Sequence, residues 1–180
     1  ADAKLVLSGT GFEGDELVSC HVGAFARFWS DFRIQPDGYG RLVVAANSTD
    51  PRDLTRLVQT LQELGNYRNR ALLGLPVAHR NLPKLSSAEA ALRELSARVS
   101  DAAITDDALL DEVSSLSIAL ATIAADTHFR MSATAAYAKL VEERLDDLRC
   151  EPIEGFASLT DFTQRRFLPA VRTCEAFKDR

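Results

Sequence analysis

The chain has 180 residues, of which 46% are hydrophobic and 26% charged, so it can bury a core without disulfides or a metal. Its 26 acidic and 21 basic residues give a formal net charge of -5, which argues against a surface dedicated to nucleic acid. The three cysteines are widely spaced and form no C-x-x-C pair. This spacing suggests neither a disulfide framework nor a zinc cluster, and it fits a reducing compartment.

Hydropathy and the two ends of the chain indicate whether it contains a membrane span and whether it belongs to a longer protein. No uninterrupted run of about 18 apolar residues occurs, so we expect no membrane span within this chain. The chain starts at Ala1 without a methionine or a signal pattern and stops abruptly at Arg180. We therefore expect it to be a piece of a longer protein.

Residues 1–47 hold most of the glycines and the short apolar runs, a composition typical of strands and turns. Residues 5–7 are a short strand candidate. Residues 32–34 and 42–44 flank the turn residues 36–40, which predicts a hairpin, because proline presets φ and glycine allows positive φ. Residues 22–32 fit either a helical stripe or one strand face, and we favour a short helix.

A long helix is predicted from Pro51 onwards. Asp50 is a good N-cap, proline suits the first helical position, and Asp53 lies in the first turn, where the helix dipole favours negative charge. A leucine-rich stripe follows as far as Leu75, and Pro76 ends it.

Further helices are predicted from their capping signals. Ser86 and Ser158 are each followed three residues later by a carboxylate, which is the pattern of a capping box, and Thr105 is placed to cap the helix between them. Pro169 should kink the last helix.

From residue 109 the apolar positions are spaced alternately four and three apart, which predicts a heptad seam with one interruption near residues 126–130. Residues 106–149 can therefore form one long helix with a stutter or two antiparallel helices. The seam positions are Leu109, Val113, Leu116, Leu120, Ile123, Met131, Thr134, Ala138, Val141, Leu145 and Leu148.

Together these elements predict an α+β fold that is predominantly α. A glycine-rich strand and hairpin subdomain at residues 1–47 should pack on an antiparallel helical bundle at residues 48–180 with coiled-coil-like helices. No long linker separates the two, so we expect one compact unit.

Motifs for catalysis or cofactor binding are missing. Residues 9–14 spell G-x-G-x-x-G, but no amphipathic helix follows to hold a pyrophosphate. There is neither a P-loop nor a G-x-S-x-G elbow, and the three histidines lie far apart. We expect no catalytic residue, no cofactor and no metal site.

Two surface clusters are candidate sites. The first, the turn cluster, crowds an indole and opposing charges around the predicted turn and is a candidate interaction surface, although core packing with surface ion pairs would also explain it. It comprises Arg27, Trp29, Asp31, Arg33, Asp37, Tyr39 and Arg41.

The second cluster, the acidic face, places two carboxylate pairs one helical turn apart. Like charges at this spacing repel unless a cation or an arginine offsets them, so the cluster is either a solvated helix face or a weak divalent-cation surface. It comprises Glu142, Glu143, Asp146 and Asp147.

Several motifs, taken in this order, resemble a bacterial family of uncharacterised proteins described as membrane-anchored, the domain of unknown function 3422. The resemblance implies a segment before Ala1, and a long helix and membrane segments after Arg180. It implies no catalytic residue, and Gly65-Asn66 departs from the family pattern. The matching motifs include Trp29-Ser30-Asp31-Phe32-Arg33, Tyr67-Arg68, Phe129-Arg130-Met131-Ser132-Ala133 and Arg165-Arg166.

These observations favour a non-enzymatic interaction or oligomerisation domain. We expect self-association through the helices, attachment to a membrane through segments absent from this chain, no nucleic-acid partner, and a place on the cytoplasmic side of the bacterial inner membrane. By analogy of layout alone, the alternative is the divalent-cation-sensing domain of a CorA-like channel, with the acidic face as sensor. A third hypothesis is an enzyme with its site at the turn cluster.

Overall fold

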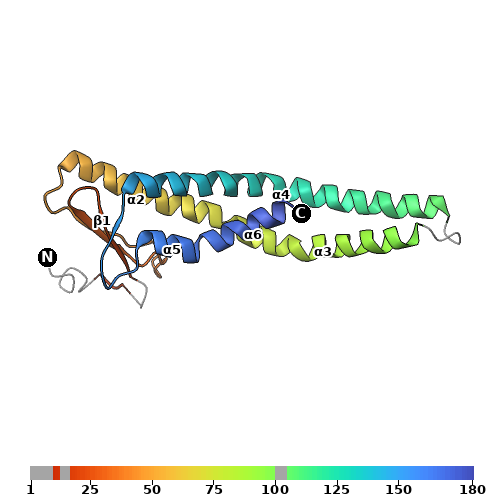
Figure 1. The fold of residues 1–180 in the computed structure, drawn as a ribbon, viewed down its shortest axis with the longest axis horizontal. Helices are drawn as coiled ribbons and strands as arrows, with labels where there is room; N and C mark the ends of the chain where they lie inside the picture. The colour runs from red at the N-terminus through yellow and green to blue at the C-terminus, as the bar shows by residue number, and fades with distance from the viewer. Residues whose placement is uncertain (1–9, 13–16, 100–104) are drawn as a thin grey trace. The chain divides into compact units, whose positions relative to one another are not determined.

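The computed structural model describes residues 10–12, 17–99 and 105–180 (Figure 1). Long helices dominate, and a small four-stranded antiparallel sheet accompanies them, as expected for an α+β fold that is predominantly α. The strand candidate at residues 5–7 and half of the glycine-rich stretch at 9–14 lie outside the described residues.

The sheet has the order β3-β2-β1-β4, with β1 at Val18–Val22, β2 at Ala26–Ser30, β3 at Val43–Ala45 and β4 at Glu151–Pro152. The short helix favoured for residues 22–32 is therefore wrong. Gly23, with φ of +61°, turns the chain between β1 and β2, and a glycine adopts that left-handed conformation without strain. One face of this hairpin is buried in the core. The apolar residues here therefore follow the two-residue period of a strand and not the period of a helix.

The predicted turn at residues 36–40 is confirmed. Ile34 and Gly40 form an isolated bridge, the backbone N–H of Gln35 donates to the Tyr39 carbonyl at 2.9 Å, and Gly38 has φ of +85°. The expected strand at 32–34 is reduced to this bridge, because Phe32, with φ of 49°, bends the chain after β2.

Helix α2 spans Pro51–Leu72, α3 Gly74–Arg98, α4 Asp106–Leu148, α5 Leu159–Arg166 and α6 Leu168–Lys178. The predicted N-caps of α2 and α5 are confirmed. Asp50 Oδ1 accepts from the backbone N–H of Arg52 at 2.8 Å, and Ser158 Oγ accepts from that of Asp161 at 3.0 Å. Proline sits at the second position of α6, so the predicted kink appears as a break between α5 and α6.

Two helix boundaries differ from the sequence prediction. Helix α2 ends three residues before Leu75, and Pro76 lies in the first turn of α3, where no intrahelical hydrogen bond is lost. No helix starts at Ser86, because α3 runs straight through it. The buried side chains of Leu85 and Ala88 hold the residues on both sides of Ser86 in the core, so the capping-box pattern is not used.

Residues 106–148 form one helix, which decides between the two alternatives left open. At the interruption, the seam continues through Thr127, four residues after Ile123 and four before Met131, which is a stutter. The Thr127 hydroxyl donates to the Ile123 carbonyl at 2.7 Å, so this buried polar side chain is satisfied within the helix.

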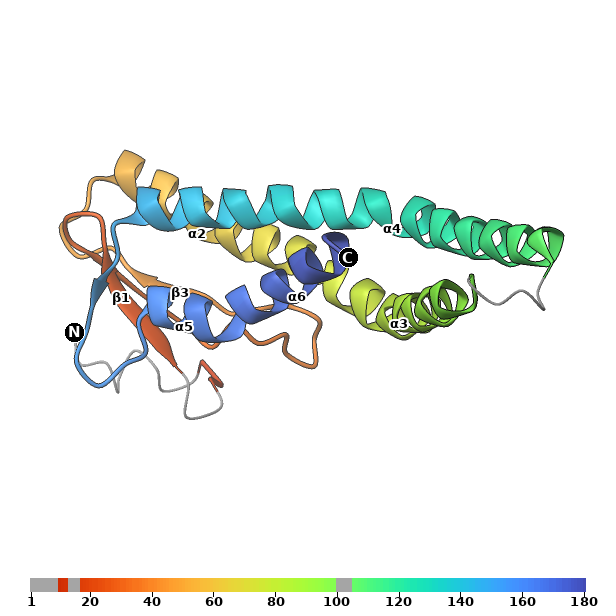
Figure 2. The same cartoon turned by 45° about the vertical axis from the view of Figure 1, so that its right-hand side comes forward.

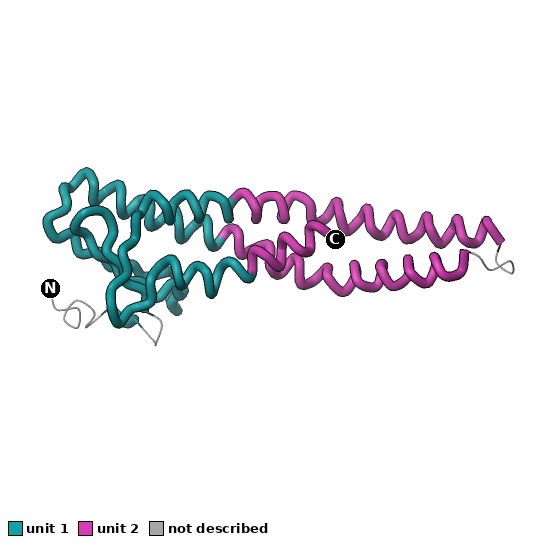
Figure 3. Tube along the Cα trace, in the orientation of Figure 1, with its two compact units in different colours: residues 1–69, 137–169 teal, residues 70–136, 170–180 magenta. Residues whose placement is uncertain are grey.

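The chain divides into two compact units (Figure 3). Unit 1 comprises residues 1–69 and 137–169. Its core packs one face of the sheet against α2, the end of α4 and α5, with Phe28, Leu64, Leu148 and Leu159 among the most buried side chains. The predicted subdomain at residues 1–47 thus shares this unit with helical segments.

Unit 2 comprises residues 70–136 and 170–180. In it α3 and the first half of α4 run antiparallel, side by side, as Figures 1 and 2 both show. Its core contains Ala78, Leu85, Met131, Cys174 and Phe177, from α3, α4 and α6.

Candidate functional site

The part of unit 2 formed by α3 and the first half of α4 exposes large apolar side chains on both helices. Because water-exposed apolar side chains that gather on one element mark interaction surfaces, we call this set the hairpin face. It consists of Leu92 (49% exposed) and Val99 (63%) of the α3 end, and Leu110 (64%), Val113 (47%) and Ile118 (69%) of α4.

Hydropathy singles out the same segment. Helix α4 contains an 18-residue window with a mean hydropathy of 1.5 in which no residue is buried. By length and composition α4 could cross a membrane, a possibility that counting only uninterrupted apolar runs had missed. A membrane span and a helix that packs against a protein partner share this length and this apolar composition.

The two arms of the hairpin contact each other less closely far from the core. Met131, Thr134, Ala138, Val141 and Leu148, in the second half of the predicted seam, are buried. In the first half, Leu109, Leu116, Leu120 and Ile123 are only half-buried, and Val113 is exposed. The guanidinium of Arg98 donates two hydrogen bonds, of 2.9 and 3.0 Å, to the Glu112 carboxylate and ties the arms together.

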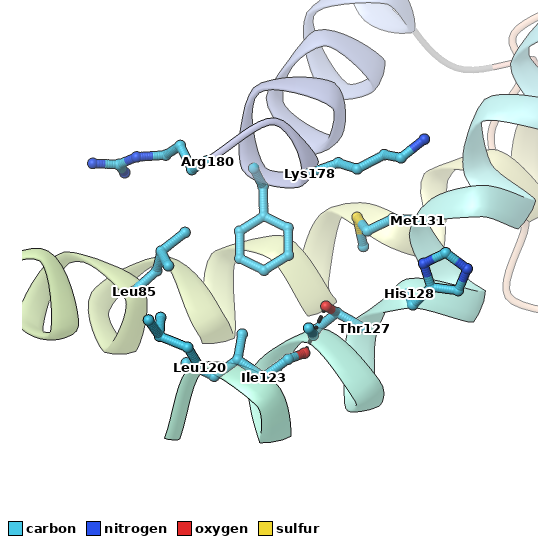
Figure 4. A pocket seen from close by; sticks show the side chains of 10 residues that line it. Leu85, Leu120, Ile123, Thr127, His128, Met131, Lys178 and Arg180 are labelled. Atoms are coloured by element: carbon cyan, nitrogen blue, oxygen red, sulfur yellow. Dashed lines mark hydrogen bonds between the residues drawn. The ribbon is translucent and has the colours of Figure 1, made fainter. Parts of the chain in front are cut away.

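A groove runs between the arms. Near α6 it forms a cavity of 310 Å³ lined by apolar side chains that include Leu85, Leu120, Ile123 and Met131 (Figure 4). Lys178 and Arg180 extend in opposite directions beside it. Farther along the same two helices, a second cavity of 470 Å³ has Leu95 and Leu116 in its lining. Asp111, Glu112 and Ser115 line this second cavity as well, so the space along the hairpin is lined by both apolar and polar side chains.

In the structure, some residues of the turn cluster are buried and others are exposed. Trp29 is 1% exposed and lies on the same strand face as Arg27, whose guanidinium stacks over the Trp29 and Phe156 rings at 4.4 and 4.9 Å. Burial lowers the pKa of Arg27. Trp29 is therefore packed in the sheet layer, and Arg27 covers it as a partly buried side chain.

Asp31 is also buried. Its carboxylate accepts from the backbone N–H of Arg33 at 3.1 Å and from the Gln35 amide at 3.0 Å, so it fixes the local turn. The Arg33 guanidinium forms no ion pair with it among the described residues. Asp37, Tyr39 and Arg41 lie on the exposed turn, where the Asp37 carboxylate is 3.9 Å from Arg41 Nη2.

The acidic face lies on the exposed side of α4, and an arginine offsets part of its charge. Arg144 donates to Asp147 and to Glu63 of α2, each at 2.8 Å, and these two hydrogen bonds raise the pKa of Arg144. Among the residues that the structure describes, no group of three or more His, Cys, Asp or Glu side chains is placed to hold a metal ion.

A pair of thiols is a feature that sequence reasoning missed. Cys20 of β1 is fully buried and Cys150, just after α4, is half-buried; both are free thiols and share a hydrogen bond. Because Cys150 donates to it, the Cys20 thiol has its pKa lowered to about 7, and the shared hydrogen bond raises the pKa of Cys150. The wide sequence separation of the two cysteines hid their contact.

Comparison with known proteins gives a family but no activity. A family model described as "Protein of unknown function (DUF3422)" matches residues 2–180. The chain belongs to this family. No curated protein and no solved structure matches it. Membership in DUF3422 agrees with the resemblance seen in the sequence and assigns no role to any residue, so function must be argued from the structure.

Proposed function

We propose that this domain is a non-enzymatic interaction domain that self-associates through the hairpin face. The observation that carries the proposal is the apolar window of α4, in which no residue is buried. A helix that is apolar on most sides is usually buried, either in a protein core or in a membrane.

A second copy of the hairpin is the partner that best fits this surface. Both arms expose apolar side chains, so two hairpins related by a two-fold axis would bury the same set of residues on each copy. Packing two hairpins together makes a four-helix bundle, an arrangement in which the half-buried seam and the groove would be filled. Two of the charges beside the face, Arg98 and Glu112, already neutralise each other.

The free energy available is large enough for a specific dimer. Burying a large apolar side chain contributes about 1.5–3 kcal/mol, so half-exposed ones contribute roughly 1 kcal/mol each. The hairpin face of both copies then contributes on the order of 10 kcal/mol, from which the cost of association is subtracted. A dissociation constant in the micromolar range is consistent with this balance.

The test is the molecular mass in solution, measured by light scattering and analytical ultracentrifugation over a range of concentrations. We expect a dimer whose dissociation constant rises at least 100-fold when Leu110 and Ile118 are both replaced by glutamate. The matched control combines Phe25→Glu with Tyr39→Glu, which adds the same two charges at exposed aromatic residues of unit 1 and should leave the dimer intact. A wild-type chain that stays monomeric at about 100 μM would overturn the proposal, because that affinity is too weak for a specific dimer.

A membrane is the competing occupant of the same face. Flotation with uncharged phosphatidylcholine vesicles separates the two possibilities: dimerisation predicts that the chain stays in the aqueous fraction. Flotation of a monomeric chain, abolished by the same glutamate pair, would instead assign the hairpin face to a lipid surface.

We also propose, from the sequence resemblance, that the parent protein is bacterial and is anchored in the inner membrane by segments beyond this chain. This domain would then lie on the cytoplasmic side, where three free cysteines are stable. Protease protection of the full-length protein in inverted membrane vesicles tests this topology: digestion of the domain supports it, and protection contradicts it.

A further inference from the structure

A pocket of 220 Å³ in unit 1 is lined by three arginines. Arg33 and Arg41 reach it from the segment around the turn, and Arg68 reaches it from α2. The amides of Gln62, Asn66 and Asn69 also line it, and no aspartate or glutamate is among its lining residues. We call it the arginine pocket. Its lining is strongly positive, although the chain as a whole carries a net charge of -5.

Arg68 is held in the pocket without a counter-charge. Its guanidinium lies 5.1 Å from the centres of both the Phe32 and Phe162 rings, which stack on each other at 4.9 Å. Its Nε is buried and has no hydrogen-bond acceptor, and among the described residues Arg68 makes no ion pair. Burial lowers its pKa.

A buried guanidinium N–H without an acceptor is costly, because the water it loses is replaced only by the aromatic rings. Almost all buried polar groups in proteins have a partner, and this exception lies beside a pocket where an ion or ligand could supply one. The fixed fork of an arginine, held in place by two rings, is suited to an oxyanion, with which it forms paired hydrogen bonds.

The other two arginines differ in how far they are already engaged. Arg33 is exposed, and its guanidinium has no partner among the described residues. Arg41 donates through Nη1 to the Thr10 carbonyl at 2.6 Å and lies 3.9 Å from Asp37. Asp31, the nearest buried carboxylate in sequence, is turned to the backbone of Arg33 and to Gln35. Two guanidinium groups therefore remain available to a ligand.

We propose that the arginine pocket binds the phosphate dianion of a small phosphate monoester. The guanidinium groups of Arg33 and Arg68, with the positive charge of Arg41 beside them, favour a dianion over a single carboxylate, and the amides of Gln62 and Asn69 add donors to the lining. The volume and the apolar residues Phe32, Ile34 and Leu42 leave room for a small organic group beside the phosphate. The pocket is half-open and small, which suits a small ester better than a nucleic-acid strand. The site does not depend on the hairpin face, which belongs to unit 2.

The experiment measures the thermal unfolding midpoint of the chain, and its heat of binding, with three probes: inorganic phosphate, glycerol 3-phosphate and phenyl phosphate. Sodium chloride at equal ionic strength is the baseline. At a ligand concentration ten times the dissociation constant, binding to the folded state should raise the midpoint by about 3–6 °C. If all three probes raise the midpoint, the pocket recognises the phosphate group itself. If only the two esters do, the pocket also requires the organic group.

Variants locate the site. Arg33→Gln, at an exposed residue whose loss does not threaten folding, should weaken phosphate binding at least tenfold, and Arg68→Lys should weaken it as well, because lysine lacks the paired donors. Arg52→Gln removes the same charge from the exposed start of α2 and should leave binding unchanged. No midpoint rise above the chloride baseline, or an unchanged response in Arg33→Gln, would overturn the proposal.

Discussion

Gly74 and Gly65 both lie in helices, yet the structure predicts opposite effects when each is replaced by alanine. Gly74 is the first residue of α3, and a Cβ placed there would overlap the Thr134 hydroxyl of α4 and lie 3.2 Å from the Cys174 sulfur of α6. At Gly65, inside α2, no atom lies within 4 Å of the added Cβ. The same methyl group is therefore blocked at one position and free at the other.

The expected magnitudes follow from these contacts. Thr134 is 2% exposed and its hydroxyl donates to the Ala71 carbonyl at 3.1 Å, so it cannot move without losing a buried hydrogen bond. Overpacking costs about 1–3 kcal/mol and the lost hydrogen bond about 1 kcal/mol, against a gain of about 0.5–1 kcal/mol for alanine in a helix. Gly74→Ala should destabilise by about 2 kcal/mol, and Gly65→Ala should stabilise by about 0.5–1 kcal/mol.

The assay is thermal unfolding followed by circular dichroism at one fixed protein concentration. In a chain of this size the midpoint should fall by about 4–8 °C for Gly74→Ala and rise by about 1–4 °C for Gly65→Ala. Combining Gly74→Ala with Thr134→Ala removes the overlap with the hydroxyl and leaves only the tight contacts of 3.1 Å to the Cβ of residue 134 and 3.2 Å to the Cys174 sulfur. The double variant should therefore be nearly as stable as Thr134→Ala alone, a coupling of about 2 kcal/mol. Equal effects of the two glycine substitutions, or no coupling in the double variant, would refute the reasoning.

Three further predictions test other parts of the structure. The pKa of Cys20 is lowered to about 7 in the folded chain from its ordinary 9.0, so the unfolded chain holds more protons between these values and stability should rise with pH there. Cys150→Ala deletes the hydrogen-bond donor and should remove the rise, which urea unfolding at several pH values measures. Ser158→Ala deletes the cap of α5 and should lower stability by about 1 kcal/mol, whereas Ser158→Asp should keep it, as urea midpoints would show. Millimolar magnesium, calcium or manganese should leave the unfolding midpoint unchanged, because Arg144 already engages the acidic face; a clear rise would favour the alternative of a divalent-cation sensor.

Local signals in the sequence predicted the helices that depend on local chemistry. The starts of α2 and α5 are set by Asp50 and Ser158, whose side chains bond to the backbone within one turn, and such contacts can be read from neighbouring residues. The same signal at Ser86 was misleading, because the packing of Leu85 and Ala88 in the core outweighs a cap.

Features that depend on distant residues were not predictable from one sequence. The apolar pattern of residues 22–32 fits both the helical and the strand period. The strand forms because β2 pairs with β1 and β3. Sequence reasoning placed Arg33 and Arg41 in a candidate site but could not add Arg68, which α2 brings to the same pocket. The contact between Cys20 and Cys150 likewise exists only because β4 pairs with β1.

The stutter at Thr127 has a consequence for how this family can vary in length. Before Thr127 the seam of α4 repeats in heptads, and the α3 arm runs antiparallel to it. An insertion or deletion in the hairpin preserves the inward-facing positions without a further stutter only when each arm changes by seven residues, a step of about 10 Å along the helix axis. We therefore expect that relatives whose hairpins differ in length differ by seven residues, or a multiple of seven, in each of the two arms.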